Sequence, residues 1–264
     1  MDYGRYRMIR AERQDRILTL TLNRPDELNA VNKELHDELA TIFYDVQGDD
    51  ESDVVVLTGA GKAFCAGGDL KFMKAMAEGR EGEFLSLVDA KKIVFSMLDL
   101  EKPIIARVNG HAMGLGATIA LLCDVVFMAE TAKIGDPHVK AGVVAGDGGA
   151  VIWPQLVGYA RAKEYLMSGD ALEAKEAERI GLVNHVVPLD DLDEAAYGYA
   201  RKLAAGPTAA VKWTKVSANI GLKQLAHAIM DTSLAYEWLT FQMEDHKEAV
   251  NAFLERRQPK FSGR

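Results

Sequence analysis

The sequence contains little cysteine and little proline, with two cysteines and seven prolines among 264 residues. Cys65 and Cys123 stand apart in apolar or glycine-rich surroundings, so they provide neither a disulfide framework nor a CxxC metal-binding spacing. The small disulfide-rich folds of secreted proteins are therefore excluded. The composition, with 48% hydrophobic and 27% charged residues, is that of a globular protein large enough to bury a full core.

Long apolar runs and excess positive charge are also missing. The longest uncharged apolar stretch, Ala112 to Cys123, is followed by Asp124 and is too short to cross a membrane. Residues 1–16 carry charges throughout, unlike a secretory signal. A formal net charge of −8 and a pI near 5.3 argue against nucleic-acid binding, which depends on neutralising phosphates. We expect a cytoplasmic protein with neither a nucleic acid nor a membrane as partner.

The first half of the chain repeats a pattern of strand, turn and helix. Residues 17–22 alternate apolar side chains with threonine, as in a half-buried strand. Residues 54–58 and 104–108 are short apolar runs typical of strands covered on both faces. Each of these two runs continues into a glycine-rich turn and a helix. The repeat predicts an α/β fold whose ligands lie beyond the strand ends.

Helical patterns dominate the chain after about residue 145. The predicted helices there are 150–157, 159–167, 191–204, 208–217 and 222–256. We divide the chain into a core at residues 1–200, which carries the site, and a helical C-terminal region at residues 201–264. No low-complexity linker separates them, so we interpret the two regions as one continuous functional unit.

The two glycine-rich turns, residues 59–70 and 109–116, allow two interpretations. Each is either a tight connection that needs glycine or a cradle of backbone N–H groups for an anion or a developing oxyanion. Two such turns, each after a buried strand, favour the cradle. The second turn does not complete a GxGxxG fingerprint, because Gly114 and Gly116 are followed by Ala117, Thr118 and Ile119. We therefore do not expect an NAD-dependent dehydrogenase.

A series of motifs resembles one enzyme family. The segments NRPDELNA, AFCAGGDL, ARVNGHAMGLGATIALLCDVVFMAE, GDPHVKAGVVAGDGG, AKEYLMSGD and AERIGLVNHVVP occur in the order and at the spacing of the enoyl-CoA hydratase/isomerase (crotonase) superfamily. The resemblance covers roughly residues 10–262. It implies a spiral of ββα units with a helical C-terminal region, an acyl-CoA thioester as substrate, and homo-oligomers that are trimers or dimers of trimers.

The resemblance also implies which residues form the site. Backbone N–H groups of Ala66 and Leu115 would form an oxyanion hole for the thioester enolate, where one such donor contributes roughly 10²–10³ in rate. Asp69 would start a helix, and we interpret it mainly as a capping residue. No metal is expected, and coenzyme A enters only as part of the substrate. The residues expected to line the substrate site are Glu27, Leu28, Ala30, Ala66, Gly67, Gly68, Asp69, Leu115, Lys260 and Phe261.

The sequence departs from the superfamily at the two glutamates that hydratases use as acid and base. Thr118 occupies the first of these positions and His138 the second, and Thr118 cannot act as a base near pH 7. We expect the proton chemistry to depend on His138, oriented by Asp147, with His138 as the base. The alternatives are a carbon–carbon hydrolase that uses His138 and Asp147, and an acyl-CoA-binding protein without catalysis.

The C-terminal helical region also motivates the expected oligomer. Its apolar positions Leu225, Ile229, Leu234 and Trp238 form a face that we expect to pack between subunits, because monomers rarely expose large apolar patches.

Overall fold

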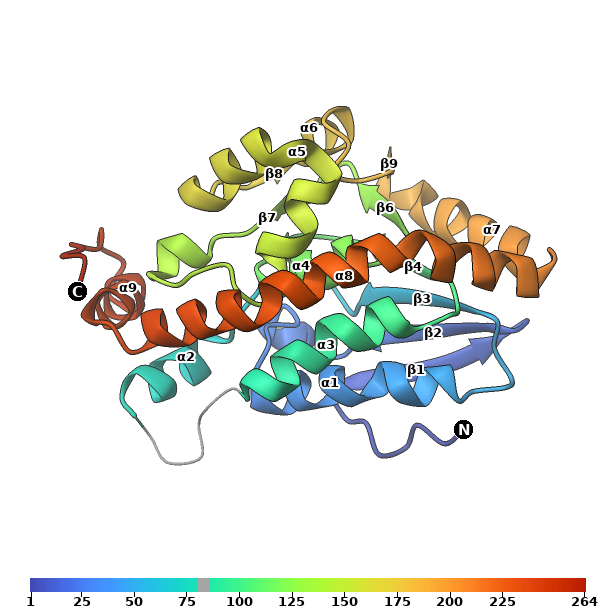
Figure 1. Cartoon of the computed structure of the whole chain (residues 1–264), viewed down its shortest axis with the longest axis horizontal. Helices are drawn as coiled ribbons and strands as arrows, with labels where there is room; N and C mark the ends of the chain where they lie inside the picture. Colours follow the sequence, from blue (N-terminus) through green and yellow to red (C-terminus); the bar gives the residue numbers. More distant parts are fainter. Residues whose placement is uncertain (80–85) are drawn as a thin grey trace.

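The computed structural model describes residues 1–79 and 86–264. Its main sheet has the strand order β1-β2-β3-β4-β6-β9 (Figure 1). The first pair is antiparallel and every later pair in this sheet is parallel. The strands are β1 (Ile9–Gln14), β2 (Ile17–Leu22), β3 (Val54–Gly59), β4 (Ile104–Val108), β6 (Val125–Ala129) and β9 (His185–Val187).

A second, smaller sheet lies next to the main one, with the order β5-β7-β8. The strand β7 is parallel to β5 and antiparallel to β8. Its strands are β5 (Ala112–Met113), β7 (Lys133–Gly135) and β8 (Leu172–Glu173). The smaller sheet and the strand β1 are features that the sequence patterns did not reveal.

Helices cover both faces of the main sheet and account for most of the chain after residue 145. They are α1 (Lys33–Gln47), α2 (Leu70–Ala77), α3 (Leu87–Asp99), α4 (Leu115–Leu121), α5 (Gly149–Ser168), α6 (Ala174–Arg179), α7 (Leu192–Ala204), α8 (Thr208–Phe241) and α9 (Glu244–Leu254). Short 3-10 helices are η1 (Pro25–Glu27), η2 (His138–Ala141) and η3 (Leu189–Asp191).

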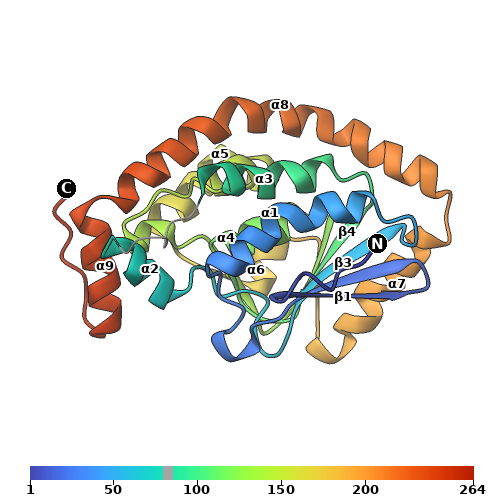
Figure 2. The ribbon, with the colours of Figure 1, turned by 90° about the horizontal axis from the view of Figure 1, so that it is seen from below.

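The layers follow from which element packs on which. Helix α7 contacts β2, β3, β4 and β6 on one face of the sheet, while α1 and α3 pack side by side on the other. The long α8 arches over α3 and α5, and α9 ends the chain beside α2 (Figures 1 and 2). The core is continuous through these layers, since Ala226, Met230 and Leu234 of α8 join the same apolar cluster as the strands.

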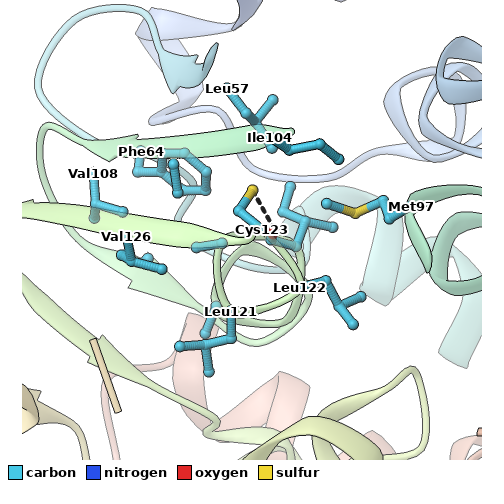
Figure 3. Packing of buried hydrophobic residues seen from close by; sticks show 14 of the residues in the cluster. Leu57, Phe64, Met97, Ile104, Val108, Leu121, Leu122, Cys123 and Val126 are labelled. Carbon is cyan, nitrogen blue, oxygen red and sulfur yellow. Dashed lines mark hydrogen bonds between the residues drawn. The ribbon is translucent and has the colours of Figure 1, made fainter. Parts of the chain in front are cut away.

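The end of α4 shows how tightly this core is packed. Met97 of α3 and Ile104 and Val126 of the neighbouring strands lie around it (Figure 3). Cys123 is buried there, and its Sγ lies 3.2 Å from the Ile119 carbonyl oxygen as a weak donor. Burial raises the pKa of this thiol, so it is held as an unreactive apolar side chain.

Two predicted helix boundaries in the C-terminal region were wrong. Helix α8 is continuous from Thr208 to Phe241, and the break falls at residues 242–243 instead of near 218–221. The helix passes through Gly221, where nothing crowds the backbone, because one glycine costs an exposed helix only about 1 kcal/mol. By contrast, the predicted break between 157 and 159 is confirmed, since Gly158 is non-helical within α5.

Part of the apolar face that was predicted to pack between subunits is covered by the chain itself. Leu234 is buried and Ile229 packs on the chain's own core, so they need no partner subunit to cover them. The exposed large apolar side chains of α8 are Trp213, Val216, Ile220, Tyr236 and Leu239. Homo-oligomerisation remains a prediction.

In the described part of the chain, no helix combines the length and the apolar character needed to cross a lipid bilayer.

Candidate active site

The two glycine-rich turns lie side by side, as their positions after adjacent parallel strands predict. They follow β3 and β4, whose carboxyl ends meet at one edge of the sheet. Cys65 joins the second turn through a bridge to Ala112, with the Cys65 N–H donating to the His111 carbonyl at 3.1 Å. An added Cβ at Gly110 would lie only 2.0 Å from the Lys62 carbonyl oxygen, so glycine permits this approach.

The structure corrects one of the two expected oxyanion-hole donors. The N–H of Ala66 donates to the Leu28 carbonyl at 3.1 Å, so it is not available to a substrate. In the adjoining parallel bridge, Val31 bonds to the Gly67 carbonyl and to the Asp69 N–H. Because backbone groups alternate in direction along an extended strand, the Gly68 N–H points away from this bridge.

Leu115 keeps the position expected of the second donor. It is the first residue of α4, and the first N–H groups of a helix have no partner within that helix. Gly114, directly before it, lies against both Gly67 of the first turn and the imidazole of His138. An added Cβ at Gly114 would be 3.8 Å from Gly67 Cα and 3.5 Å from His138 Cε1. The turns and His138 therefore border one site.

His138 is surrounded by three carboxyl groups. Its Nδ1 contacts the Asp136 carboxylate directly, and its Nε2 lies 3.4 Å from Asp147 Oδ2 and 3.9 Å from Glu237 Oε1. Thr118 donates its hydroxyl to Asp147 Oδ1 at 3.5 Å. The structure thus brings together Thr118, His138 and Asp147, and adds two acids that sequence reasoning missed.

These neighbours fix the charge of the imidazole. Burial alone would lower the pKa of His138, but the nearby carboxylates of Asp136 and Asp147 outweigh it and raise that pKa well above 6.5. The ring is therefore an imidazolium at neutral pH. This charge state does not favour the expected role of His138 as the base, because a ring that already holds both protons cannot accept another; that role stays a prediction.

Glu237 differs from a surface glutamate in its pKa. Burial raises its pKa well above 4.5, and the negative charge of Asp147 raises it further, against the opposing effect of His138. The protonated, uncharged form of Glu237 is therefore favoured relative to that of a surface glutamate. It lies near the end of α8, which carries it into the site from the C-terminal region.

The glycines of the AGDGG segment make room for these polar side chains. An added Cβ at Gly149 would lie 2.2 Å from Asp136 Oδ2, and one at Gly148 would lie 2.7 Å from Thr118 Cγ2. At Gly146 it would meet Glu237 Cβ at 2.6 Å. Real Cβ atoms do not approach other atoms so closely. Each of these three glycines is therefore needed by the residue that lies against it, which is Asp136, Thr118 or Glu237.

The early segment is held against the first turn. Leu28 accepts the Ala66 N–H, and the Ala30 carbonyl accepts a hydrogen bond from Arg24. Arg24 also pairs with Asp69 at 3.0 Å. Glu27 ends the short helix η1 just before this contact. The segment therefore borders the first turn, and its role in lining the substrate site stays a prediction.

Asp69 caps α2, as predicted. Its Oδ1 accepts the N–H groups of Lys71 at 2.9 Å and Phe72 at 3.1 Å. Burial would raise its pKa, but these hydrogen bonds and Arg24 outweigh burial and lower it below 3.8. A cavity of about 800 Å³ borders Asp69, with Arg24 and Lys71 in its lining.

Lys260 and Phe261 are not brought to His138 directly. The backbone N–H of Lys260 donates to Glu248 of α9 at 2.7 Å, and Phe261 is half exposed. Helix α9 itself packs on both α2 and η2, so the tail lies on a helix that borders the site.

Asp136, His138 and Asp147 are also the three described residues whose geometry could hold a metal ion, with one ligand atom each within 4.8 Å. The direct contact between His138 Nδ1 and Asp136 leaves no space for an ion between those two atoms. The expectation of no metal remains a prediction.

Comparison with known proteins identifies the family of this chain. A family model described as enoyl-CoA hydratase/isomerase matches residues 12–264. The chain belongs to the enoyl-CoA hydratase/isomerase family. It is accordingly an enzyme of a family that processes acyl-CoA thioesters, and its fold is the crotonase fold predicted from the motifs.

Several relatives of this enoyl-CoA hydratase/isomerase family member cover nearly its whole length. The short-chain-enoyl-CoA hydratase of Clostridium acetobutylicum is 38% identical over 94% of this chain and 94% of its own. The 1,2-epoxyphenylacetyl-CoA isomerase of Escherichia coli is 36% identical, covering 94% and 95%. A crystal structure of an enoyl-CoA hydratase/isomerase from Mycobacterium paratuberculosis superposes with a TM-score of 0.86, at 38% identity and with 92% and 97% covered.

The two missed acids of this family member left different traces in the sequence. Asp136 stands two residues before His138, so the DPH motif already contained it. Glu237 is the sole acid between Asp231 and Glu244, inside the largely apolar segment SLAYEWLTF. A lone acid in such a segment is a signal for a buried functional carboxyl group.

Proposed function

We propose that this enzyme hydrates an enoyl-CoA through a thioester enolate held by the backbone N–H groups of Gly68 and Leu115. Both groups are at the meeting point of the two turns, and neither donates to a strand or helix within the described residues. Negative charge that develops on the thioester oxygen would be stabilised there without reorganisation of the protein.

The observation that carries the proposal is a pair of acids beside these donors, with Asp147 Oδ2 at 3.4 Å and Glu237 Oε1 at 3.9 Å from His138 Nε2. In the proposed reaction Asp147, next to the imidazole of His138, is the proton acceptor, and Glu237, whose pKa burial raises well above 4.5, is the proton donor. Two acids in unlike environments are suited to act as base and acid. This pair takes the place of the two glutamates that Thr118 and His138 replace.

The proposed step balances its protons. Asp147 accepts a proton from water as the water oxygen bonds to the β-carbon of the enoyl group. Glu237 donates its proton to the α-carbon, and His138 stabilises the carboxylate that remains. Thr118 keeps Asp147 in place by donating its hydroxyl to Oδ1.

A second candidate function is carbon–carbon hydrolysis of a 3-oxoacyl chain. The contact between His138 Nε2 and Asp147 Oδ2 at 3.4 Å favours it, because a carboxylate held by an imidazole can take the proton of a water that attacks a carbonyl carbon. The enolate that would leave in such a reaction is stabilised by the same two N–H groups.

One experiment separates these functions. A panel of 2-enoyl-CoA, 3-enoyl-CoA and 3-oxoacyl-CoA thioesters is incubated with the enzyme in heavy-oxygen water and followed by mass spectrometry. Hydration adds one heavy-oxygen water to an intact 2-enoyl thioester and supports the proposal. A shift of the double bond without added oxygen, cleavage into two fragments, or binding without turnover each contradicts it.

Variants of the two acids sharpen this test. We expect Asp147→Asn and Glu237→Gln each to lower kcat by roughly 10²–10⁴-fold. The matched control is Asp170→Asn, because Asp170 is an exposed acid that pairs with Lys140 on the outside of η2. Full activity of either acid variant would contradict its assigned role.

A further inference from the structure

Asp136 is an acid buried in the site that the proposed reaction does not use. Its side chain is fully buried, and Oδ1 contacts His138 Nδ1 and also accepts the His138 backbone N–H at 3.4 Å. The other oxygen, Oδ2, has no hydrogen-bond partner among the described residues. A buried carboxylate held mainly by one imidazole is costly unless that imidazole carries a positive charge.

Every element packed around His138 presents an acid or no charge to it. Asp136 faces Nδ1 from the segment after β7, while Asp147, before α5, and Glu237 of α8 face Nε2. His246 of α9 forms a hydrogen bond between its Nδ1 and the Ala141 carbonyl oxygen. Burial lowers the pKa of His246, so its imidazole is neutral. Lys140, on η2 itself, is turned to Asp170 at the surface.

We propose that Asp136 is a positioning residue that accepts the Nδ1–H of His138 and keeps the ring cationic, so that the Nε2–H always faces Asp147 and Glu237. The two ring nitrogens then have separate tasks, because Nδ1 anchors the ring and Nε2 acts on the reacting groups. This inference rests on the proposed function, since the presented Nε2–H matters only if Asp147 and Glu237 transfer protons.

The start of α5 supports the charge on Asp136. Oδ2 lies against Gly149, the first residue of this twenty-residue helix, where an added Cβ would be 2.2 Å away. The N-terminus of a helix favours a nearby anion. Glycine at this position therefore permits the carboxylate to sit both at the helix start and on the imidazole.

The first measurement needs no substrate and is made on the native protein. Nitrogen-15 NMR of the native protein reports whether each ring nitrogen of His138 carries a proton, with the resonance assigned by its loss in His138→Gln. We expect both nitrogens to be protonated at neutral pH. A neutral ring at neutral pH would overturn the proposal.

The second measurement removes the charge of Asp136 and keeps its shape. In Asp136→Asn the amide oxygen can still accept from Nδ1, so we expect the His138 titration midpoint to fall by about one pH unit or more, as loss of an adjacent opposite charge dictates. The midpoint of the activity loss on the basic side of the pH profile should shift to lower pH by the same amount, and KM should change little. Asp170→Asn is the control and should leave both curves in place.

The outcomes distinguish this inference from the proposed function. An unchanged His138 titration in Asp136→Asn overturns the positioning role, whatever the enzyme catalyses. A shifted titration in a protein that hydrates no enoyl-CoA supports the role of Asp136 on the charge of His138 and rejects the proposed reaction instead.

Discussion

The raised pKa of Glu237 leads to a prediction about stability that does not depend on knowing the substrate. Glu237→Gln replaces a buried acid with an uncharged group of the same shape. In the unfolded chain a glutamate loses its proton above its ordinary pKa of 4.5, whereas folded Glu237 keeps its proton to much higher pH. The folded wild-type protein therefore loses stability as pH rises through this window, and the glutamine variant has no such proton to retain.

The size of the effect follows from the raised pKa. Each pH unit between 4.5 and the folded pKa costs the wild-type protein about 1.4 kcal/mol. The free energy of unfolding of Glu237→Gln should therefore gain on that of the wild type at this rate as pH rises above 4.5. The gain ends where the pH passes the folded pKa.

The assay is urea unfolding at a fixed protein concentration and at several pH values, since assembly would add a concentration-dependent contribution. Glu244→Gln, at an exposed glutamate at the start of α9, is the matched control and should show a nearly constant difference from the wild type. A difference for Glu237→Gln that is flat, or that shrinks as pH rises, would show that Glu237 is ionised in the folded protein and would refute the reasoning.

Three further predictions follow from other contacts of the site. Gly68→Pro removes the proposed donor N–H and should lower kcat/KM by roughly 10²–10³-fold with CoA binding retained, measured by steady-state kinetics and calorimetry; Gly68→Ala should be much milder. Gly149→Ala should displace the Asp136 carboxylate and reduce both stability and turnover, whereas Gly221→Ala, in open space on α8, should raise the melting temperature. Asp69→Ala should lower the free energy of unfolding by at least about 1 kcal/mol at neutral pH, and its difference from the wild type should shrink as pH falls below 3.8, because folded Asp69 has a lowered pKa.

Local patterns were sufficient for the elements that carry the fold. The apolar runs at residues 54–58 and 104–108 became β3 and β4, and Asp69 begins its helix by accepting backbone N–H groups. Such features depend on a few neighbouring residues, so they can be inferred from a short window of sequence. The short strands β5, β7 and β8 could not be inferred, because pairing across the chain defines them.

The site was predictable in its positions and less so in its chemistry. The motifs identified His138 and Asp147, but the charge of His138 depends on Asp136 and on how completely the fold buries the group. Glu237 reaches the site from ninety residues further along the chain than Asp147, so no local spacing relates them. The Ala66 N–H was wrongly expected to be free for a substrate, since the direction of an N–H depends on the strand bridge that its neighbours form.

The close approach of Gly149 to Asp136 has a consequence for how this sequence can evolve. An alanine at position 149 would occupy the volume of the Asp136 carboxylate, so it becomes acceptable only after position 136 has changed to a smaller residue. The two positions are thus epistatic, and the order of the two substitutions matters. A lineage that acquires a side chain at 149 has already given up the anchor of His138. A glycine at position 149 in a related sequence therefore indicates that Asp136 can still hold His138 as a cation.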